Sequence, residues 1–405
     1  MERRRVVITG LGAVTPIGLT AMESWQAVKD GVCGVAPITQ FDPTGMKVQL
    51  AAEVKGFVPE NYMSKPEAKR MARFTQLAVV SAKEALENAG FTLDEAEADR
   101  CGVIVSSGIG GLFLTEAEHD KGKEKGWDRV SPFYIPMGIC NMAAGQIAIH
   151  TGFRGMCSCP VTACTGGTNA VGDAFHYIRD GYADVMLCGG TESAVTPLAI
   201  GAFTSMKALT QNPDPDRASI PFDAERSGFV LGEGAAILLL EELEHAKARG
   251  ARILAEVVGY GATCDAYHMT APRPDGSGAA KAMEMALADG GAKPEDVDYI
   301  NAHGTSTPLN DAGETAAVKT VFGDHAYKLA ISSTKSMTGH MLGAAGAVEA
   351  MFCAMALHDG YLPATINYQV PDPACDLDVV PGHGRSADVR YAMSNSLGFG
   401  GHNGS

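Results

Sequence analysis

The 405-residue chain lacks the long apolar stretches that would place it in a membrane. No segment approaches the ~18–20 consecutive apolar residues of a membrane-spanning helix. Basic side chains open residues 1–10, but the apolar run behind them ends within a few positions, whereas a secretory signal needs ~7–15 apolar residues. We therefore expect a cytoplasmic protein that does not bind membranes.

Cysteine patterns of disulfide-rich or metal-binding proteins are missing as well. The chain has 10 cysteines but no Cys-x-x-Cys pair. Cys157 and Cys159 are too close for an ordinary disulfide bond, and as metal ligands they lack further spaced Cys or His partners. We expect a reduced protein without a metal site, in which most cysteines, these two included, are small core residues.

Positive charge is scarce. Lys and Arg number 32 against 47 Asp and Glu, which gives a net charge of −15 and argues against nucleic-acid binding. An acidic protein partner is not excluded, because a local basic patch steers association against the overall sign of charge. The run Gly10-Leu11-Gly12 lacks the third glycine of a dinucleotide fingerprint, so no nucleotide cofactor is expected.

Glycine and apolar residues are abundant, with 48 glycines and 46% apolar residues. This composition suits an α/β enzyme with many tight strand-to-helix turns. Strand-like and helical runs alternate along the whole chain, which predicts a layered α/β architecture. The strands are expected at residues 5–9, 102–106, 158–163 and 184–188, and the helices at 65–88, 169–178 and 197–207.

The second half of the chain repeats patterns of the first half in the same order. Residues 6–13, 102–108 and 184–190 are echoed by residues 257–262, 298–304 and 390–396. One such pair could arise from shared composition, but three in order favour a duplication. We predict an N-terminal half at residues 1–250, with a cap or interface insertion at about 110–157, and a C-terminal half at residues 251–405.

Cys164 is the candidate nucleophile. It lies where an apolar, strand-like run meets a helical run, and the free N–H groups and positive dipole at the first turn of a helix favour a thiolate. Gly166 and Gly167 add no side-chain bulk, so a substrate carbonyl has room to approach. Far downstream, His303 and His340 follow strand-like or Gly-rich segments, which makes them candidate imidazole partners.

Six motifs in one order are similar to those of a known family. They are TACTGG at 162–167, PFD at 221–223, GEG at 232–234, NAHGTST at 301–307, STKSMTGH at 333–340 and NSLGFGG at 395–401. On these motifs, residues 6–403 resemble the β-ketoacyl-acyl carrier protein synthases of the thiolase fold, most closely type II. The resemblance implies an α/β, thiolase-like duplicated fold with five layers, helix–sheet–helix–sheet–helix, and a homodimer formed through the first half.

The resemblance also implies a reaction, the elongation of fatty acids. Cys164 would take an acyl group from an acyl carrier protein as a thioester. His303 and His340 would stabilise the enolate that forms when malonyl-acyl carrier protein loses carbon dioxide, and attack by this carbanion gives a 3-oxoacyl-acyl carrier protein. Backbone N–H groups of Cys164 and Phe399 would hold the tetrahedral oxyanion. The substrates carry phosphopantetheine and no further cofactor is expected, while a structural monovalent cation stays open.

Supporting residues follow from the same resemblance. Lys335 and Glu349 would lie behind the histidines and set their charge state, since a buried Lys needs a carboxylate partner. Phe399 would be a gate for the acyl chain, because glycines on both sides let its loop move. The remaining substrate and loop positions are Asp265, His268 and Thr270 opposite the gate, Gly400 within it, Thr305 and Thr307 along the pantetheine arm, and Ile109 at the depth limit of the acyl pocket.

An acidic carrier protein needs a basic landing site. The candidates are Lys65, Lys69, Arg70, Arg73, Arg129 and Lys207. The first four are spaced mostly three or four residues apart, which predicts one positive helical face. Binding to such a face weakens with added salt. An ordinary solvated helix face, with Glu67 beside it, is the alternative.

Several other functions compete with fatty-acid elongation on the sequence alone. A thiolase would carry a second catalytic cysteine in the final glycine loop, and a type III synthase would have Asn in place of His340, so neither fits. A polyketide synthase subunit is poorly separated from fatty-acid elongation. A non-catalytic chain-length partner would lack Cys164, and a cysteine hydrolase leaves the second histidine unexplained. Relatives usually continue through one more strand after the glycine loop, which leaves the rigidity of that loop open, and acyl-length preference is not predicted.

Overall fold

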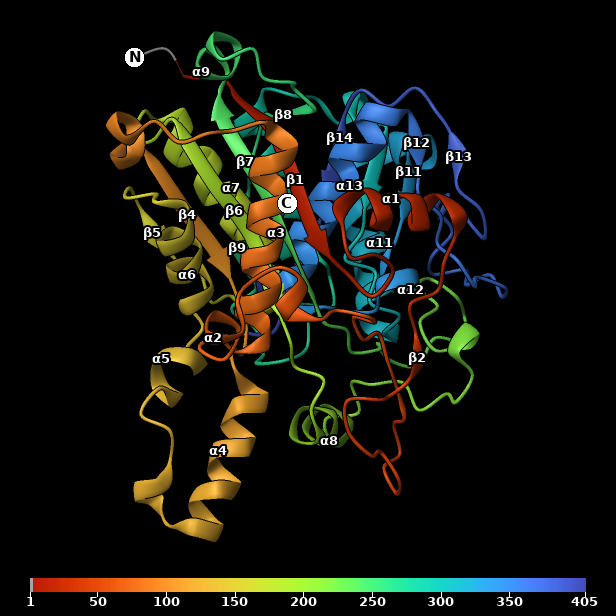
Figure 1. Ribbon diagram of the computed structural model, residues 1–405. Helices are drawn as coiled ribbons and strands as arrows, with labels where there is room; N and C mark the ends of the chain where they lie inside the picture. The colour runs from red at the N-terminus through yellow and green to blue at the C-terminus, as the bar shows by residue number, and fades with distance from the viewer. Residues whose placement is uncertain (1–2) are drawn as a thin grey trace.

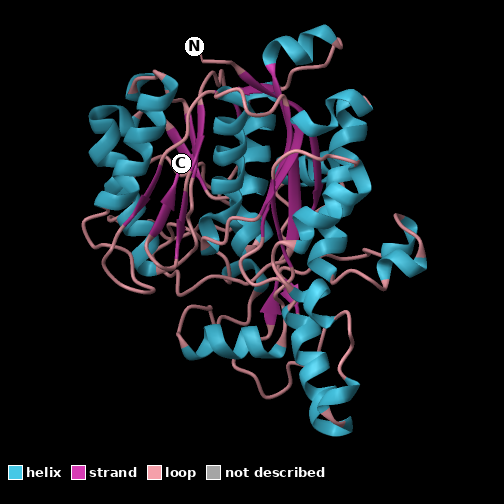
Figure 2. Cartoon of the chain, turned by 90° about the vertical axis from the view of Figure 1, so that its left-hand side faces the viewer, coloured by secondary structure: helices cyan, strands magenta, loops and turns pink. Residues whose placement is uncertain are grey.

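Two β-sheets with helices between and outside them form the body of the protein (Figure 1). The computed structural model describes residues 3–405. In the side view, two groups of strands are separated by helices and covered by helices on both outer faces (Figure 2). The predicted order of five layers, helix–sheet–helix–sheet–helix, is confirmed.

The first sheet has six strands in the order β5-β4-β6-β7-β1-β8. Their bounds are β1 Val6–Val14, β4 Cys101–Ser106, β5 Cys157–Ser158, β6 Val185–Glu192, β7 Gly234–Glu242 and β8 Ala255–Val257. β4 pairs in parallel with β5 and β6, whereas β7 pairs antiparallel with β6 and β1. Every residue of β1 and β6 is buried, because helices cover both faces of this sheet.

The second half repeats this order in shorter strands. Parallel β11-β10-β14 is continued by antiparallel β15-β16-β9, and only Asn395 separates β14 from β15. The bounds are β9 Ala262–Cys264, β10 Tyr299–Asn301, β11 Ala330–Ser332, β14 Ala392–Ser394, β15 Ser396–Gly398 and β16 His402–Gly404, with short ribbons β2 Ala36–Pro37, β3 Leu50–Ala51, β12 Tyr361–Leu362 and β13 Arg385–Ser386. The repeated order supports a duplication, while the division at residue 250 stays a prediction.

Helices α7 and α13 form the central layer. α7 packs on β4 and β6, and α13 packs on α7 and β14. α3 and α6 cover the outer face of the first sheet, and α10 packs on β9 and β16 of the second. The bounds are α1 Ala21–Asp30, α2 Lys65–Ala68, α3 Arg73–Ala89, α4 Leu112–Lys125, α5 Tyr134–Gly138, α6 Met142–Thr151, α7 Gly166–Arg179, α8 Pro197–Ser205, α9 Leu243–Ala248, α10 Ser277–Gly290, α11 Pro308–Phe322, α12 Lys335–Thr338 and α13 Ala345–Asp359. Within residues 3–405, every helix is too short or too polar to cross a bilayer.

Four predicted elements are wrong in their extent, of which β1 and β6 run to Val14 and Glu192, beyond the expected ends at residues 9 and 188. The strand expected at residues 158–163 ends at Ser158, and a 3-10 turn at Ala163–Thr165 leads into α7. The helix expected at residues 65–88 is split into α2 and α3, because Ala72 between them has an extended backbone with φ −69° and ψ 158°. Ser64 and Glu67 form a capping box on α2, which makes it a separate short helix.

The predicted insertion at about 110–157 contains α4, α5 and α6. α4 and α5 project from the body (Figure 1), whereas α6 packs on α3 and β4. The projecting part exposes large apolar side chains, namely Phe113, Trp127, Phe133, Ile135 and Ile139. Exposed apolar surface of this kind is typical of a protein–protein interface.

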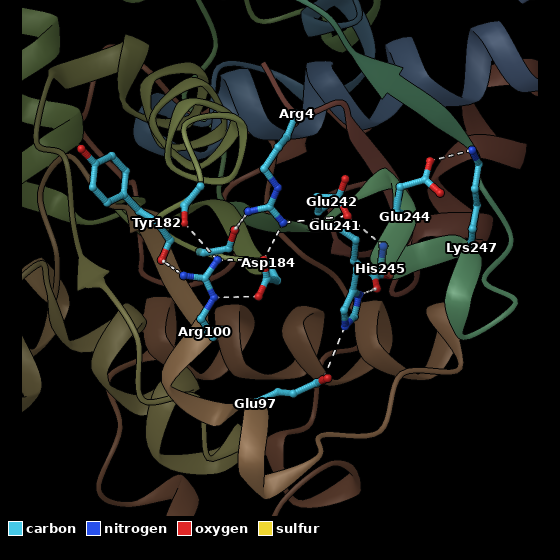
Figure 3. Close-up of polar contacts among 12 residues, drawn as sticks. Arg4, Glu97, Arg100, Tyr182, Asp184, Glu241, Glu242, Glu244, His245 and Lys247 are labelled. Carbon is cyan, nitrogen blue, oxygen red and sulfur yellow. Dashed lines mark hydrogen bonds and ion pairs between the residues drawn. The ribbon is translucent and has the colours of Figure 1, made fainter. Parts of the chain in front are cut away.

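A charged network fastens the chain before β1 to one end of the first sheet (Figure 3). Asp184, directly before β6, accepts hydrogen bonds from Arg4 and, at 2.7 and 2.8 Å, from Arg100. Arg100 lowers the pKa of Asp184 to about 2, with Arg4 adding to the effect against the opposing influence of burial. β6 runs from this network to Glu192, so the other end of the sheet lies roughly 25 Å away at ~3.3 Å per residue.

Glu241 on β7 extends the same network into the core. It is fully buried and accepts hydrogen bonds from Thr9, His245 and Arg249. Burial on its own raises the pKa of Glu241, but hydrogen bonds from Arg249, His245 and Thr9 outweigh burial and lower it to about 2. Glu241 also raises the pKa of His245. The network is therefore a stabilising anchor at the end of the sheet opposite Glu192.

Candidate active site

Cys164 lies in a tight turn between β5 and α7. The turn is the 3-10 segment Ala163–Thr165, whose first residue has φ 51°, a strained value for a residue other than glycine. The N–H and the hydroxyl of Thr165 donate to the carbonyl of Thr162, at 3.2 and 2.6 Å. The side chain of Cys164 is left 8% exposed within an apolar cluster that Ile109 borders.

The two glycines after Cys164 allow helix packing. A Cβ at Gly166 would lie 1.9 Å from the hydroxyl oxygen of Ser106. A Cβ at Gly167 would lie 2.6 Å from the backbone nitrogen of Ala347 on α13. Both positions face neighbouring elements, so the structure assigns them to close packing of α7 instead of the predicted access for a substrate carbonyl.

Burial keeps the thiol of Cys164 protonated at rest. It raises the pKa of the thiol to about 12, although the Lys335 ammonium and the backbone N–H groups of Phe399 and Cys164 act in the opposite direction. Desolvation thus opposes the thiolate that the helix terminus is predicted to favour, and that prediction stays a prediction. Charge on the sulfur has to develop while the proton leaves.

His303 and His340 lie edge to face, with ring centroids 5.2 Å apart and planes at 87°. Each side chain is 3% exposed, and Nδ1 of each is buried without a hydrogen-bond partner among residues 3–405. Burial lowers the pKa of both imidazoles well below the usual value, and Lys335 adds to the effect. Both imidazoles are therefore neutral near pH 7, and each carries one N–H.

Lys335 and Glu349 form a buried ion pair, at 1% and 2% exposure, in which Lys335 Nζ donates to Glu349 Oε1. The turn of Cys164 packs on the 3-10 turn Leu342–Ala344 that follows His340, and His303 lies against His340, so the nucleophile candidate and both imidazoles share one buried site. Lys335 acts to lower the pKa of all three groups. Burial raises the pKa of Glu349 to about 7 against the influence of Lys335. The structure thus brings together five of the predicted site residues.

Glu314 was not predicted, and it holds the backbone beside His303. Its two carboxylate oxygens accept the N–H groups of His303 and Gly304, both at 2.8 Å. Burial raises the pKa of Glu314 to about 7, and these two N–H donors oppose the rise. The available signal is the spacing on α11, where Glu314 shares the buried face of Val318 and Phe322, since residues four apart lie on one side of a helix.

Glu192 at the end of β6 is a second carboxylate that the sequence reasoning missed. Its hydrogen-bond donors are the hydroxyl of Ser107 and the N–H groups of Gly108, Ile109 and Gly343, at 2.8 to 3.2 Å. Glu192 therefore joins the loop before α4 to the segment that follows His340. It fixes the backbone of Ile109, whose side chain borders the apolar cluster around Cys164.

The loop of Phe399 contacts the segment that begins at Asp265. The N–H of Gly400 donates to the carbonyl of Met269, and the N–H of Asp265 donates to the carbonyl of Gly401, both at 2.8 Å. The N–H of Phe399 itself acts on the pKa of the Cys164 thiol. The structure therefore places this loop between the nucleophile candidate and the predicted partner loop.

The remaining predicted substrate positions lie in two pairs. His268 Nδ1 accepts the N–H of Thr270 at 3.1 Å, within the segment that contacts the Phe399 loop. The hydroxyls of Thr305 and Thr307 are 2.9 Å apart and directly follow the His303 segment. A pantetheine arm has amide groups that such hydroxyls bind, but this role stays a prediction.

One candidate docking residue is not available as predicted. Arg73 donates to the fully buried carboxylate of Glu233 at 2.9 and 2.7 Å, and its half-buried side chain is therefore committed to an ion pair instead of a free positive face. Lys65, Lys69 and Arg70 are exposed on and after α2. Arg129 and Lys207 are exposed on other segments.

Comparisons with known proteins agree with this arrangement. The family models described as "Beta-ketoacyl synthase, N-terminal domain" and "Beta-ketoacyl synthase, C-terminal domain" match residues 3–246 and 254–369. The chain is 53% identical over 404 residues to 3-oxoacyl-[acyl-carrier-protein] synthase 2 of Synechocystis sp., covering 100% of this chain and 97% of the relative. It is 50% identical over 402 residues to the protein of the same name from Staphylococcus aureus, covering 99% and 97%.

A solved structure gives the same result. A type II PKS acyl-carrier protein in complex with its ketosynthase bound to the hexaketide matches with a TM-score of 0.92 and 36% identity, over 99% of this chain and 98% of that chain. The two family models together cover most of the chain, and the relatives align over nearly its full length. The protein therefore belongs to the beta-ketoacyl synthase family.

Proposed function

We propose that this protein is a type II 3-oxoacyl-[acyl-carrier-protein] synthase that lengthens fatty acids by two carbons in each reaction. The proposal is carried by one observation, the grouping of the buried Cys164 turn with the buried imidazoles of His303 and His340. The relatives at 50 and 53% identity carry this name, whereas the polyketide ketosynthase is 36% identical. The difference favours fatty-acid elongation over polyketide synthesis.

In the first half-reaction, the sulfur of Cys164 attacks the thioester carbonyl of an acyl-acyl carrier protein. A new C–S bond forms on Cys164, the old one breaks, and the pantetheine thiol leaves with the proton that Cys164 gives up. The N–H groups of Cys164 and Phe399, which already act on the sulfur, hold the oxyanion of the tetrahedral intermediate. One thioester replaces another, so the exchange is nearly balanced in energy.

In the second half-reaction, malonyl-acyl carrier protein loses its carboxylate as carbon dioxide. The electron pair of the broken C–C bond moves toward the thioester oxygen, which the N–H groups of His303 and His340 stabilise. Neutral imidazoles suit this task, because an imidazolium would protonate the carbanion and stop the reaction. The carbanion attacks the acyl carbonyl on Cys164, the new C–C bond forms and the C–S bond breaks. The Cys164 thiolate that leaves then takes one proton from solvent, the proton that each turnover consumes.

Lys335 and Glu349 keep the two imidazoles in this state. The ammonium lowers the pKa of each imidazole further than burial alone does. The ion pair itself is buried, so its geometry is fixed by the surrounding core. Both residues therefore act through the histidines and do not contact the substrate.

The substrate reaches Cys164 past the Phe399 loop. We assign Phe399 and Gly400 to a gate that the Asp265, His268 and Thr270 segment supports through the Gly400 to Met269 hydrogen bond. Thr305 and Thr307 bind the amides of the pantetheine arm. Ile109 limits the depth of the acyl pocket, because it borders the same apolar cluster as Cys164.

The proposed partners are an acyl carrier protein and a second copy of this chain. The carrier binds Lys65, Lys69 and Arg70 on one segment and Arg129 and Lys207 on others, and the ketosynthase relative solved with its carrier protein supports this partnership. The second copy covers the exposed apolar side chains of the α4–α5 projection and the edge strand β5. The enzyme works in the cytoplasm, and its substrates carry the only prosthetic group, phosphopantetheine.

The proposal is tested by separating the two half-reactions. In His340→Ala, we expect normal acyl loading of Cys164 but at least a hundredfold slower release of carbon dioxide from malonyl-acyl carrier protein, because one donor to the enolate is lost. His383→Ala, which changes an exposed histidine outside the site and the α4–α5 projection, is the matched control. Loss of acyl loading alone in His340→Ala would contradict the division of labour between the thiol and the imidazoles.

A further inference from the structure

Tyr260 lies in the second half of the chain, between β8 and β9, and reaches α7 in the first half. Its neighbours fix its backbone against α10, because a Cβ at Gly259 would lie 2.2 Å from the carbonyl oxygen of Ala286 and one at Gly261 would lie 2.1 Å from that of Ala282. Tyr260 is therefore held between two positions of close helix packing.

The ring of Tyr260 lies flat on α7. A Cβ at Gly172 would be 2.3 Å from ring atoms, so only glycine permits this contact. His176, one turn further along α7, contacts the ring edge to face with centroids 5.3 Å apart. The N–H of Tyr260 donates to Asp289 at 3.2 Å, and Asp289 also binds His176 at 2.8 Å. The ring has little freedom to move relative to α7.

The hydroxyl of Tyr260 begins a hydrogen-bond chain that ends beside Cys164. The side-chain amide of Asn169 donates to this hydroxyl and accepts the hydroxyl hydrogen of Thr162, the second bond being 2.7 Å long. Thr162 directly precedes Ala163, the strained residue before Cys164. Such a backbone persists only where its surroundings hold it on both sides. The Thr165 bonds hold the following side, and the Asn169 bond holds the side chain of Thr162.

We infer that Tyr260 is a positioning residue for the nucleophile, acting through Asn169 and Thr162 on the turn that aims the sulfur of Cys164. The inference rests on the proposed function, in which Cys164 accepts the acyl group. This positioning role concerns only the first half-reaction. His303 is supported by Glu314 and His340 by its β-bridge to Leu231, and neither histidine belongs to the hydrogen-bond chain of Tyr260. A disturbed turn slows acyl loading of Cys164 and leaves malonyl decarboxylation unaffected.

The test uses Tyr260→Phe and Thr162→Val, which remove one hydroxyl each and keep the shape of the side chain. Acyl transfer to Cys164 is followed by intact-protein mass spectrometry, and carbon dioxide release from malonyl-acyl carrier protein is measured without an acyl donor. We expect each variant to load the acyl group about three- to tenfold more slowly, as the loss of one hydrogen bond implies, with decarboxylation within about twofold of the unchanged protein. The double variant should load the acyl group no more slowly than the slower single variant, because both substitutions interrupt the same hydrogen-bond chain.

Tyr177→Phe is the matched control, because Tyr177 lies on α7, the helix that Tyr260 contacts, and its ring packs against Tyr182 instead. It should load acyl groups at the unchanged rate. Acyl loading within about 1.5-fold of normal in both Tyr260→Phe and Thr162→Val would overturn the inference, and so would a parallel loss of both half-reactions, which indicates general damage. If the unchanged protein takes no acyl group at all, the proposed function fails and not the positioning role.

Discussion

Removing the ammonium of Lys335 while leaving Glu349 in place should be costly. The two side chains are 1% and 2% exposed, and Oε2 of Glu349 already has no hydrogen-bond partner among residues 3–405. In Lys335→Met the remaining carboxyl loses its ion pair, and its pKa, already about 7 because of burial, rises further. Breaking a buried ion pair by removing one partner costs about 3–5 kcal/mol.

The double variant Lys335→Met/Glu349→Leu separates stability from catalysis. It replaces the pair by apolar side chains of similar volume, which is often neutral or stabilising, so we expect most of the lost free energy of unfolding to return. Decarboxylation should stay impaired at low pH, because without the ammonium the pKa values of His303 and His340 rise and the imidazoles become protonated more easily. The acidic limb of the pH–rate profile should therefore move to higher pH.

Urea unfolding of the single and double variants measures the first effect, and carbon dioxide release as a function of pH measures the second. The reasoning is refuted if Lys335→Met loses less than about 1 kcal/mol, or if the double variant is no more stable than the single one. An acidic limb that stays in place in both variants would refute the role of Lys335 in setting the charge state of the histidines.

Three further predictions concern two other carboxylates and a pair of basic residues. The stability due to Glu241 is complete above its ordinary pKa of 4.5 and lost as pH falls toward about 2, a contribution of about 3 kcal/mol, so urea unfolding of Glu241→Gln should show a weaker loss between pH 5 and 3 than the unchanged protein. In Glu314→Gln, the amide oxygen can accept only one of the two backbone N–H groups that the carboxylate binds. We expect decarboxylation to slow about tenfold while the rate of acyl loading is unchanged. Equal slowing of both half-reactions would contradict this. Arg73→Ala should lower the free energy of unfolding by about 2–3 kcal/mol with an unchanged KM for the carrier protein, whereas Lys69→Glu should raise that KM and leave stability unchanged. A raised KM with unchanged stability in Arg73→Ala would instead show that Arg73 contributes to the docking surface.

Much of the layered fold could be predicted, because strands buried on both faces appear in the sequence as short apolar runs between helical segments. The prediction failed where an apolar run had another cause. Val161 lies within the expected strand at residues 158–163 but is 54% exposed. Its apolar side chain therefore belongs to the protein surface near the Cys164 turn and does not indicate a buried strand. The break at Ala72 was equally hidden, because alanine is a strong helix former and its extended backbone depends on tertiary packing.

The centre of the site was predictable because its residues follow strand ends in recognisable motifs. Its supports were not, because their partners are backbone groups that no side-chain pattern reveals. Glu192 binds N–H groups on two distant segments, and Glu314 binds those of His303 and Gly304. The sequence likewise did not reveal the role of Arg73, because its partner, the buried Glu233, is brought next to it only by the fold.

The most direct test of the account is intact-protein mass spectrometry with an acyl-acyl carrier protein, followed by addition of malonyl-acyl carrier protein. The account predicts an acyl adduct that maps to Cys164 and is then lost as a carrier-bound product two carbons longer appears. An adduct on another residue, an adduct that only hydrolyses, or the same condensation in Cys164→Ala would contradict it.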